Sequence, residues 1–186
     1  MAQKICLIPG DGIGPEVAHS AREVISASGA AIEWVELPAG ASALETHGAV
    51  LPEETIQAIE FHKVALKGPV TTPIGKGFTS VNVGLRKRLN LYAAVRPVRN
   101  LPGIQSRYEN VDLVVVRENT EGLYSGIENE IVPGVFQSLK IATRLGCERI
   151  ARYAFQYARL RGRHRVTVFH KANIMKKSDG LFLECA

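Results

Sequence analysis

A polar segment that includes Ser80, TSVNVGLRKRLNLYAAVR, has side chains suited to binding a small polyanion. Ser80 is a good helix-capping residue, and the following residues have helical character. Ser80 and Asn82 would therefore lie at a helix N-terminus, where unpaired N–H groups and the helix dipole attract anions. Arg86, one turn later, and Arg96, on the predicted strand LYAAV, would add cationic donors. The segment favours a ligand with several carboxylates; the alternative is a simple helix cap beside solvated arginines.

The elements that must position these residues alternate between strands and helices. Strands are predicted over Lys4–Ile8, Ala31–Leu37, Val111–Asn119 and Arg165–Lys171, and helices over Glu16–Ser26, Pro52–His62 and Cys147–Leu160. This alternation predicts an α/β fold, with a mainly parallel sheet, helices on both faces and ligands at the carboxyl ends of the strands. The last segment, IMKKSDGLFLECA, begins a helix that neither glycine nor proline terminates, so we expect a chain cut inside an element.

Two loops at strand ends are candidate ligand contacts. The turn GDGIGPE has G-x-G-x-G spacing, which fits a phosphate cradle or a tight strand-to-helix turn. In KGPVTTP, Lys67, Thr71 and Thr72 are natural contacts for a cofactor or substrate, but a polar loop fixed by prolines explains the segment equally well.

Residues 122–143 alternate around a Pro-Gly turn and predict a two-stranded arm that carries Tyr124. An apolar arm outside a layered core often pairs with a second copy of itself. The strand before it ends on Arg117, Glu118 and Asn119, where a buried strand should emerge.

Composition sets broad limits on function. The 186 residues are 46% hydrophobic and 22% charged, as in soluble globular proteins, and the net charge of +5 suits acidic metabolites, polyanions or membrane surfaces. No stretch approaches the roughly 18 apolar residues of a membrane span, and the N-terminus lacks a signal-peptide core, so we expect cytoplasm or an organelle matrix. Three cysteines without a CxxC pair fit reduced thiols. The basic run Arg159–Arg165 fits a solvated helix end, with nucleic-acid binding as the alternative.

Five segments together resemble one enzyme family. LIPGDGIGPEV, KGPVTTP, SVNVGLRKRLNLYAAVRPV, RENTEGLYSG and HKANIMKKSDGLF occur in the order found in metal-dependent β-decarboxylating dehydrogenases acting on isocitrate, isopropylmalate and homoisocitrate. The S-x-N-x-x-x-R stretch resembles isocitrate dehydrogenase, and the last two segments resemble its NAD-linked forms. The resemblance implies an isopropylmalate-dehydrogenase-like fold, with residues 1–91 as part of a large domain and 92–186 as a smaller α/β domain including the arm.

The resemblance also implies site residues. Substrate carboxylates would be bound by Ser80, Asn82, Arg86, Arg96 and Arg117, and the nicotinamide of NAD or NADP would be lined by Thr71, Thr72 and Asn173. In the family, a divalent ion (Mg²⁺ or Mn²⁺) chelates the substrate, hydride passes to the nicotinamide, and the β-keto acid loses carbon dioxide. Lys171 would help remove the hydroxyl proton and Tyr124 would reprotonate the enolate.

Two expectations follow from where this sequence departs from the family pattern. Only Asp179 and Glu184 follow Lys171, and neither matches the family's metal-binding aspartates, so metal ligands are expected outside this segment and the chain alone is expected to be inactive. The family implies a homodimer clasped by the arm, with Lys171 reaching the partner's site. The alternatives are an isopropylmalate- or homoisocitrate-type enzyme, or a non-catalytic substrate-binding or regulatory subunit.

Overall fold

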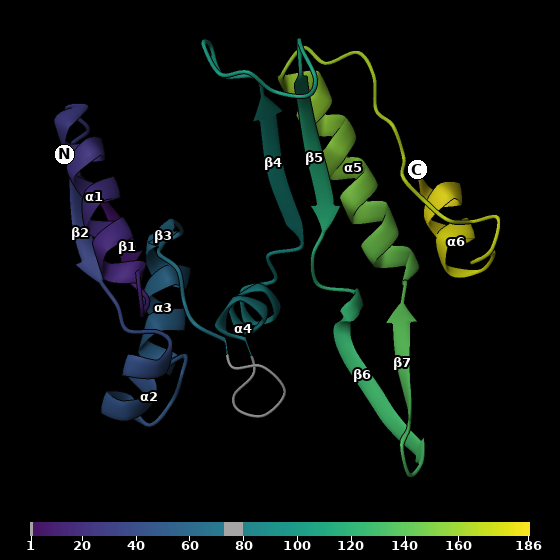
Figure 1. Cartoon of the computed structure of the whole chain (residues 1–186), viewed down its shortest axis with the longest axis horizontal. Helices are drawn as coiled ribbons and strands as arrows, with labels where there is room; N and C mark the ends of the chain where they lie inside the picture. The colour runs from purple at the N-terminus through teal and green to yellow at the C-terminus, as the bar shows by residue number, and fades with distance from the viewer. Residues whose placement is uncertain (1, 73–79) are drawn as a thin grey trace. The chain divides into compact units, whose positions relative to one another are not determined.

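The computed structural model describes residues 2–72 and 80–186 (Figure 1). The chain divides into two compact units, Met1–Leu89 and Asn90–Ala186. Among the described residues, no helix combines the length and apolar character needed to cross a bilayer.

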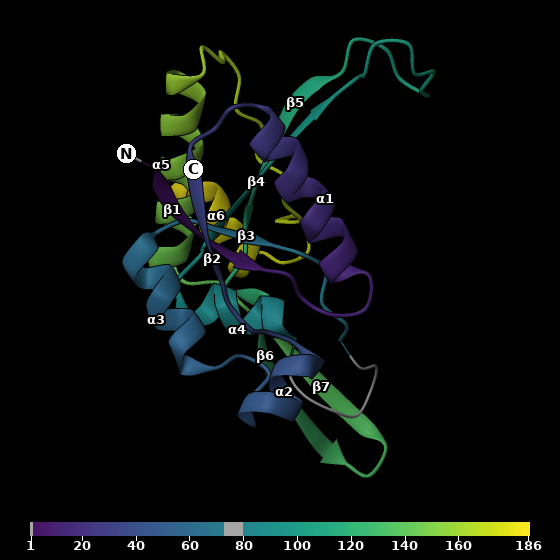
Figure 2. The same cartoon turned by 90° about the vertical axis from the view of Figure 1, so that its left-hand side faces the viewer.

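The first unit is built on a three-stranded parallel sheet. Strand β1 (Gln3–Ile8) is central, between β2 (Ile32–Glu36) and β3 (Ala65–Lys67). Helix α1 (Gly14–Ala27) leads from β1 to β2, and α3 (Glu53–His62) leads back to β3. The connection from β1 to β2 moves to one edge of the sheet, and the connection from β2 to β3 crosses back to the other edge. Since both connections are right-handed, α1 and α3 lie on opposite faces of the sheet, as Figure 2 shows. The predicted parallel sheet with helices on both faces is confirmed.

Helix α4 (Val81–Arg88) is fixed to the core of this unit by one apolar side. Val81 and Leu85 are 1% and 7% exposed and join a cluster that includes Ile8 and Ile56. The helix predicted after Ser80 is therefore confirmed. The short helix α2 (Ala41–His47) was not predicted, because seven residues give too little apolar periodicity.

The second unit contains an antiparallel strand pair packed on a long helix. Strand β4 (Ala93–Arg99) pairs with β5 (Asp112–Glu118), and α5 (Arg144–Leu160) packs against β5. Val114 and Val116 are half-buried, whereas Leu113 and Val115, on the alternate face, are each 47% exposed. The two faces of this sheet therefore differ: one is covered by α5 and the other is open.

The arm forms as predicted, with β6 (Gly122–Val132) antiparallel to β7 (Val135–Ile141). The strand predicted over residues 165–171 is wrong. A strand needs a partner for its backbone groups, and within the described chain no segment pairs with residues 165–170. The chain then turns, and the last helix, α6 (Ser178–Cys185), begins later than its sequence pattern indicated.

Candidate active site

The loops after β1 and β3 touch through their backbones. A Cβ on Gly10, which has a φ of +82°, would lie 1.8 Å from the carbonyl oxygen of Pro69, and one on Gly14 would lie 2.5 Å from the same oxygen. A Cβ on Gly68 would lie 2.2 Å from the carbonyl oxygen of Pro9. The glycines are thus required for loop packing, which supports the interpretation of GDGIGPE as a tight strand-to-helix turn.

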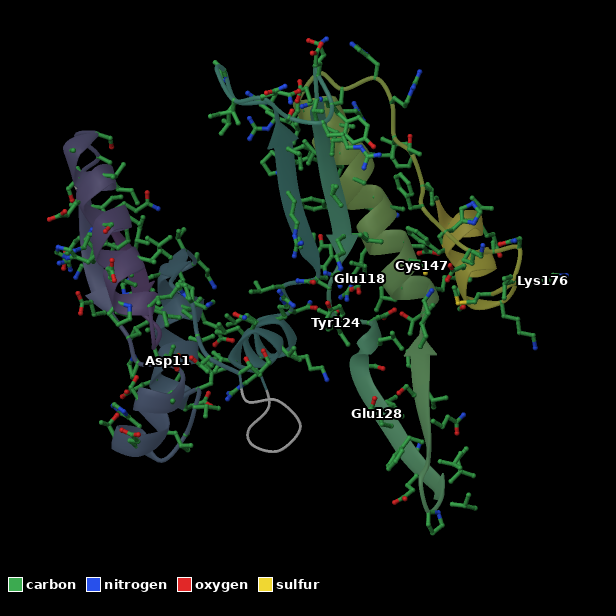
Figure 3. All side chains as sticks on the ribbon, viewed as in Figure 1. Asp11, Glu118, Tyr124, Glu128, Cys147 and Lys176 are labelled. Carbon is green, nitrogen blue, oxygen red and sulfur yellow. The ribbon has the colours of Figure 1, made fainter. Side chains whose placement is uncertain are left out.

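Asp11, labelled in Figure 3, connects the loop after β1 with the loop after β3 and with the first residue of α2. One of its carboxylate oxygens accepts the backbone N–H of Thr71 at 2.6 Å, and the other accepts that of Ala41 at 2.7 Å. Although burial alone would raise the pKa of Asp11, these hydrogen bonds and the charge of Lys67 hold it below its ordinary value. Asp11 therefore fixes the backbone of Thr71, while the side chains of Thr71 and Thr72 remain exposed.

Helix α4 presents the residues predicted to bind an anion. Ser80 occupies the N-cap position but its side chain makes no capping hydrogen bond, so capping does not account for the hydroxyl. Asn82 and Arg86 lie one turn apart on one side of the helix. Burial lowers the pKa of Lys67, the Arg86 charge lowers it further, and the Asp11 charge opposes both. The predicted helix start at Thr79 lies outside the described residues.

Arg117 and Tyr124 are in direct contact in the second unit. The Arg117 Nη2 donates a hydrogen bond to the Tyr124 hydroxyl at 2.5 Å, and the guanidinium carbon lies 4.7 Å from the ring centre. Arg96 lies opposite Val115 in the β4–β5 register, two residues before Arg117. Arg96 and Arg117 are therefore diagonal neighbours on the open face of this sheet. The structure brings these three predicted residues together.

A hydrogen-bonded turn between β5 and β6 sets the spacing of Arg117 and Tyr124. The Glu118 carboxylate accepts the backbone N–H groups of Thr120 at 2.9 Å and Glu121 at 2.8 Å, and it pairs with Arg149 on α5 at 3.2 Å. Burial alone would raise the pKa of Glu118, but these hydrogen bonds hold it below its ordinary value. Glu118 had no predicted role, since its partners are fixed by a turn geometry that sequence does not specify.

Lys171 and Asn173 lie on the exposed turn that precedes α6. The Lys171 N–H donates to the Asp179 carboxylate at 2.7 Å, and Asp179 also pairs with Lys140 on β7. In Figure 3, Lys176 on the same turn lies well apart from Tyr124. Within its own unit, the structure therefore does not bring the Lys171 turn to Tyr124.

The residues at this end of the chain do not fit a divalent metal. The Asp179 carboxylate is occupied by Lys140 and Lys171, and Glu184 pairs with Arg144 at 2.9 Å. In the described ranges, no group of three or more His, Cys, Asp or Glu side chains is arranged to hold an ion.

Comparison with known proteins decides the family. Residues 4–186 match the family model described as isocitrate/isopropylmalate dehydrogenase. The chain belongs to this family. The resemblance inferred from the five segments is thereby confirmed, and the protein is a member of an oxidoreductase family.

Three relatives with different names within the family are almost equally similar to this chain. The chain is 54% identical, over 96% of its length, to "Isocitrate dehydrogenase [NAD] catalytic subunit 5, mitochondrial" of Arabidopsis thaliana, covering 48% of that protein. It is 55% identical, over 98% of its length, to a mitochondrial regulatory subunit of NAD isocitrate dehydrogenase from Dictyostelium discoideum, covering 50% of that protein. It is 52% identical, over 96% of its length, to "3-isopropylmalate dehydrogenase, chloroplastic" of Solanum tuberosum, again covering 50% of the relative. Identity alone therefore does not separate catalytic from regulatory subunits, or the two substrates.

The fold agrees with a solved family member. The structure matches isocitrate dehydrogenase from Methylococcus capsulatus with a TM-score of 0.93 and 50% identity, over 99% of this chain and 55% of that one. The chain thus spans about half the length of the curated relatives it matches. The predicted isopropylmalate-dehydrogenase-like α/β fold is confirmed.

Proposed function

We propose that the whole protein to which this chain belongs converts isocitrate to 2-oxoglutarate by oxidative decarboxylation, with NAD as the preferred hydride acceptor. The observation that carries this proposal is the contact between Arg117 and Tyr124, with Arg96 beside them on the open sheet face. Planar guanidinium groups suit bidentate carboxylate binding. A phenol held next to them can donate a proton to a substrate whose carboxylates these arginines bind.

The substrate contacts are proposed residue by residue. Ser80 and Asn82 bind the carboxylate arm that distinguishes isocitrate, because their hydroxyl and amide lie at a helix N-terminus. Arg86, Arg96 and Arg117 bind the remaining carboxylates. The hydroxyl of Ser80 is not used for capping, which supports its assignment to substrate.

The proton-transfer roles belong to Lys171 and Tyr124. Lys171 helps remove the hydroxyl proton of the substrate, and Tyr124 returns a proton to the enolate after decarboxylation. When bound, NAD would accept the hydride on its nicotinamide ring. Thr71, Thr72 and Asn173 line its nicotinamide, and the Asp11 carboxylate supports this assignment for Thr71 because it fixes the backbone there. No step is assigned to a metal, since the described residues do not provide a ligand set for Mg²⁺ or Mn²⁺.

We propose a homodimer in which the arm contacts a second copy of the chain. The arm carries a series of exposed large apolar side chains: Ile127, Ile131, Val132, Val135 and Phe136. Exposed apolar surface of this kind marks interaction sites.

For a eukaryotic source, we propose that the protein is located in the mitochondrial matrix, since the catalytic and regulatory relatives are both named mitochondrial.

The experiment that tests the catalytic assignment is Lys171→Met in the full-length protein. We expect turnover of isocitrate with NAD and Mg²⁺ to be abolished, while calorimetry still detects isocitrate binding through the arginines. Lys177→Met, an exposed lysine at the N-cap of α6, is the matched control and should keep wild-type turnover. Wild-type rates in Lys171→Met would refute the assignment.

A regulatory subunit is the second candidate, favoured by the 55% identity to a regulatory relative. It predicts a different result with the wild-type protein: isocitrate binds by calorimetry, but no NADH or NADPH forms with either nucleotide and Mg²⁺ or Mn²⁺.

A further inference from the structure

The turn that carries Lys171 has few attachments to the rest of the chain. Within the described chain, residues 165–170 pair with no strand, so they do not hold it in a sheet. The Lys171 carbonyl accepts the N–H groups of Ile174 at 3.0 Å and Met175 at 2.8 Å, which fold the turn locally. Backbone contacts connect the turn to α6: the Lys171 N–H donates to the Asp179 carboxylate at 2.7 Å, and the Met175 carbonyl accepts the Asp179 N–H at 3.0 Å.

Asp179 is buried where it receives this bond. Its side chain is 10% exposed, in the first turn of α6, and its second oxygen pairs with Lys140 Nζ on β7. The Lys140 ammonium also lies 3.7 Å from the Met175 sulfur. A carboxylate accepting both a backbone N–H and an ammonium makes charge-assisted bonds, which are stronger than neutral ones. Asp179 thus connects the lysine turn, α6 and the end of the arm.

From this geometry we infer that Asp179 is the positioning residue for Lys171, and that Lys140 links this position to the arm; the inference rests on the proposed role of Lys171 as the proton acceptor. The Lys171 side chain is exposed and long, so its reach depends on where its backbone is fixed. Because Asp179 accepts the N–H and the local turn holds the carbonyl, the backbone of Lys171 is connected to β7 through Asp179 and Lys140. If the arm packs against a second copy of the chain, the Lys171 backbone would be held in a fixed position relative to that copy.

A role limited to stabilising α6 predicts different behaviour. Glu184 lies on the same helix and makes an exposed ion pair with Arg144, without contacting Lys171. Glu184→Ala therefore perturbs α6 but leaves the lysine turn attached, and it is the matched control for Asp179→Ala. Lys140→Met removes the link to the arm but keeps the carboxylate that accepts the Lys171 N–H.

The first test uses steady-state kinetics of the full-length enzyme. We expect Asp179→Ala to lower kcat about 100-fold with the KM for isocitrate within about twofold, since small misplacement of a reacting group costs turnover of this order. Lys140→Met should lower kcat less, and Glu184→Ala should leave both constants within about twofold of wild type. Rates are expressed per folded protein, from the thermal unfolding amplitude, so loss of fold alone does not mimic the effect. A kcat for Asp179→Ala within twofold of wild type would overturn the inference.

The second test does not depend on turnover. Amide hydrogen exchange at Lys171 in the same proteins should be slow in wild type and Glu184→Ala and at least tenfold faster in Asp179→Ala, with α5 amides unchanged. Unchanged exchange at Lys171 would refute the contact itself. If wild-type protein fails to turn over isocitrate while this exchange pattern holds, the proposed function fails and the attachment of the turn by Asp179 stands.

Discussion

In the proposed site, the Arg117 guanidinium would serve two partners, the Tyr124 hydroxyl and a substrate carboxylate. One nitrogen donates to the Tyr124 hydroxyl, and the planar group retains further donors for a carboxylate. The hydrogen bond orients the phenol oxygen relative to the open face of the β4–β5 sheet. A lysine at this position would supply one charge without the fork that serves both partners.

Tyr124→Phe keeps the ring contact with Arg117 but removes the donor. We expect the full-length enzyme to lose about 100-fold in isocitrate turnover, in the range attributed to general acid catalysis. Reduction of the β-keto acid intermediate should fall much less, because that half of the reaction does not need the phenol proton. Parallel assays of both half-reactions check this, and equal losses in the two would contradict the assignment.

Asp11, Glu118 and Asp179 show what sequence reasoning missed at the residue scale. Each is a carboxylate that accepts at least one backbone N–H brought close by the fold, so no spacing rule reveals these contacts. By contrast, Ser80, Asn82 and Arg117 stood out because they fall at predicted element ends. Arg86 follows Asn82 by one helical turn, and the role of Tyr124 came from the family resemblance. The pairing of Arg117 with Tyr124 itself required the structure, since it depends on the turn between two strands.

At the element scale, Glu118 should shape the acid stability of the protein. Its folded pKa is lowered, so its contribution is fully present above its unfolded pKa of about 4.3 and is lost as pH falls through the folded pKa. Glu118→Gln should therefore lower unfolding free energy by about 1 kcal/mol at pH 7 and reduce the loss of stability below about pH 4.3. Denaturant melts across pH 3–7 measure this, with Glu60→Gln, an exposed carboxylate on α3, as control. If the unfolding free energy of the variant falls with decreasing pH as steeply as that of wild type, the turn does not depend on Glu118.

The glycine loops allow a second test at this scale. Gly10 and Gly29 have similar φ values of +82° and +80°, but a Cβ on Gly29 meets nothing within 4 Å. Gly29→Ala should therefore cost about 1 kcal/mol from backbone conformation alone. Gly10→Ala should cost about 3 kcal/mol or more, since the Cβ must also displace Pro69. Equal shifts in thermal unfolding would show that the two loops do not pack as described.

Segments with a clear apolar, β-branched or helix-start pattern were predictable, whereas the seven-residue helix α2 was missed and the segment 165–171, unpaired within the described chain, was wrongly predicted as a strand. The positions of α1 and α5 follow from apolar spacing, and that of α3 from a proline and glutamates in its first turn. Strand β1 follows from a short apolar run and β5 from a β-branched run. The run RVTVFHK has the same β character, but a strand also needs a neighbour, and within the described chain none pairs with it. Pairing partners are a property of the whole fold, which local sequence does not encode.

At the scale of the whole molecule, the arm should carry the subunit contact. Phe136 is 73% exposed near the tip of the arm. Phe136→Asp in the full-length protein should shift the sedimentation coefficient from dimer towards monomer, because burying an unpaired carboxylate opposes association. Phe61→Asp on α3, where the side chain is 81% exposed in the first unit, should leave assembly unchanged. A dimer that persists in the Phe136 variant would place the contact elsewhere.

The family relationship leaves the substrate as the central claim, since relatives named for isocitrate and for isopropylmalate are almost equally similar to this chain. The most direct measurement is kcat/KM of the full-length protein for isocitrate, isopropylmalate and homoisocitrate, each with NAD and NADP in the presence of Mg²⁺. We predict that isocitrate with NAD gives the highest value, at least 100-fold above isopropylmalate, with 2-oxoglutarate as product. A higher kcat/KM for isopropylmalate or homoisocitrate would contradict the assignment of Ser80 and Asn82 to isocitrate.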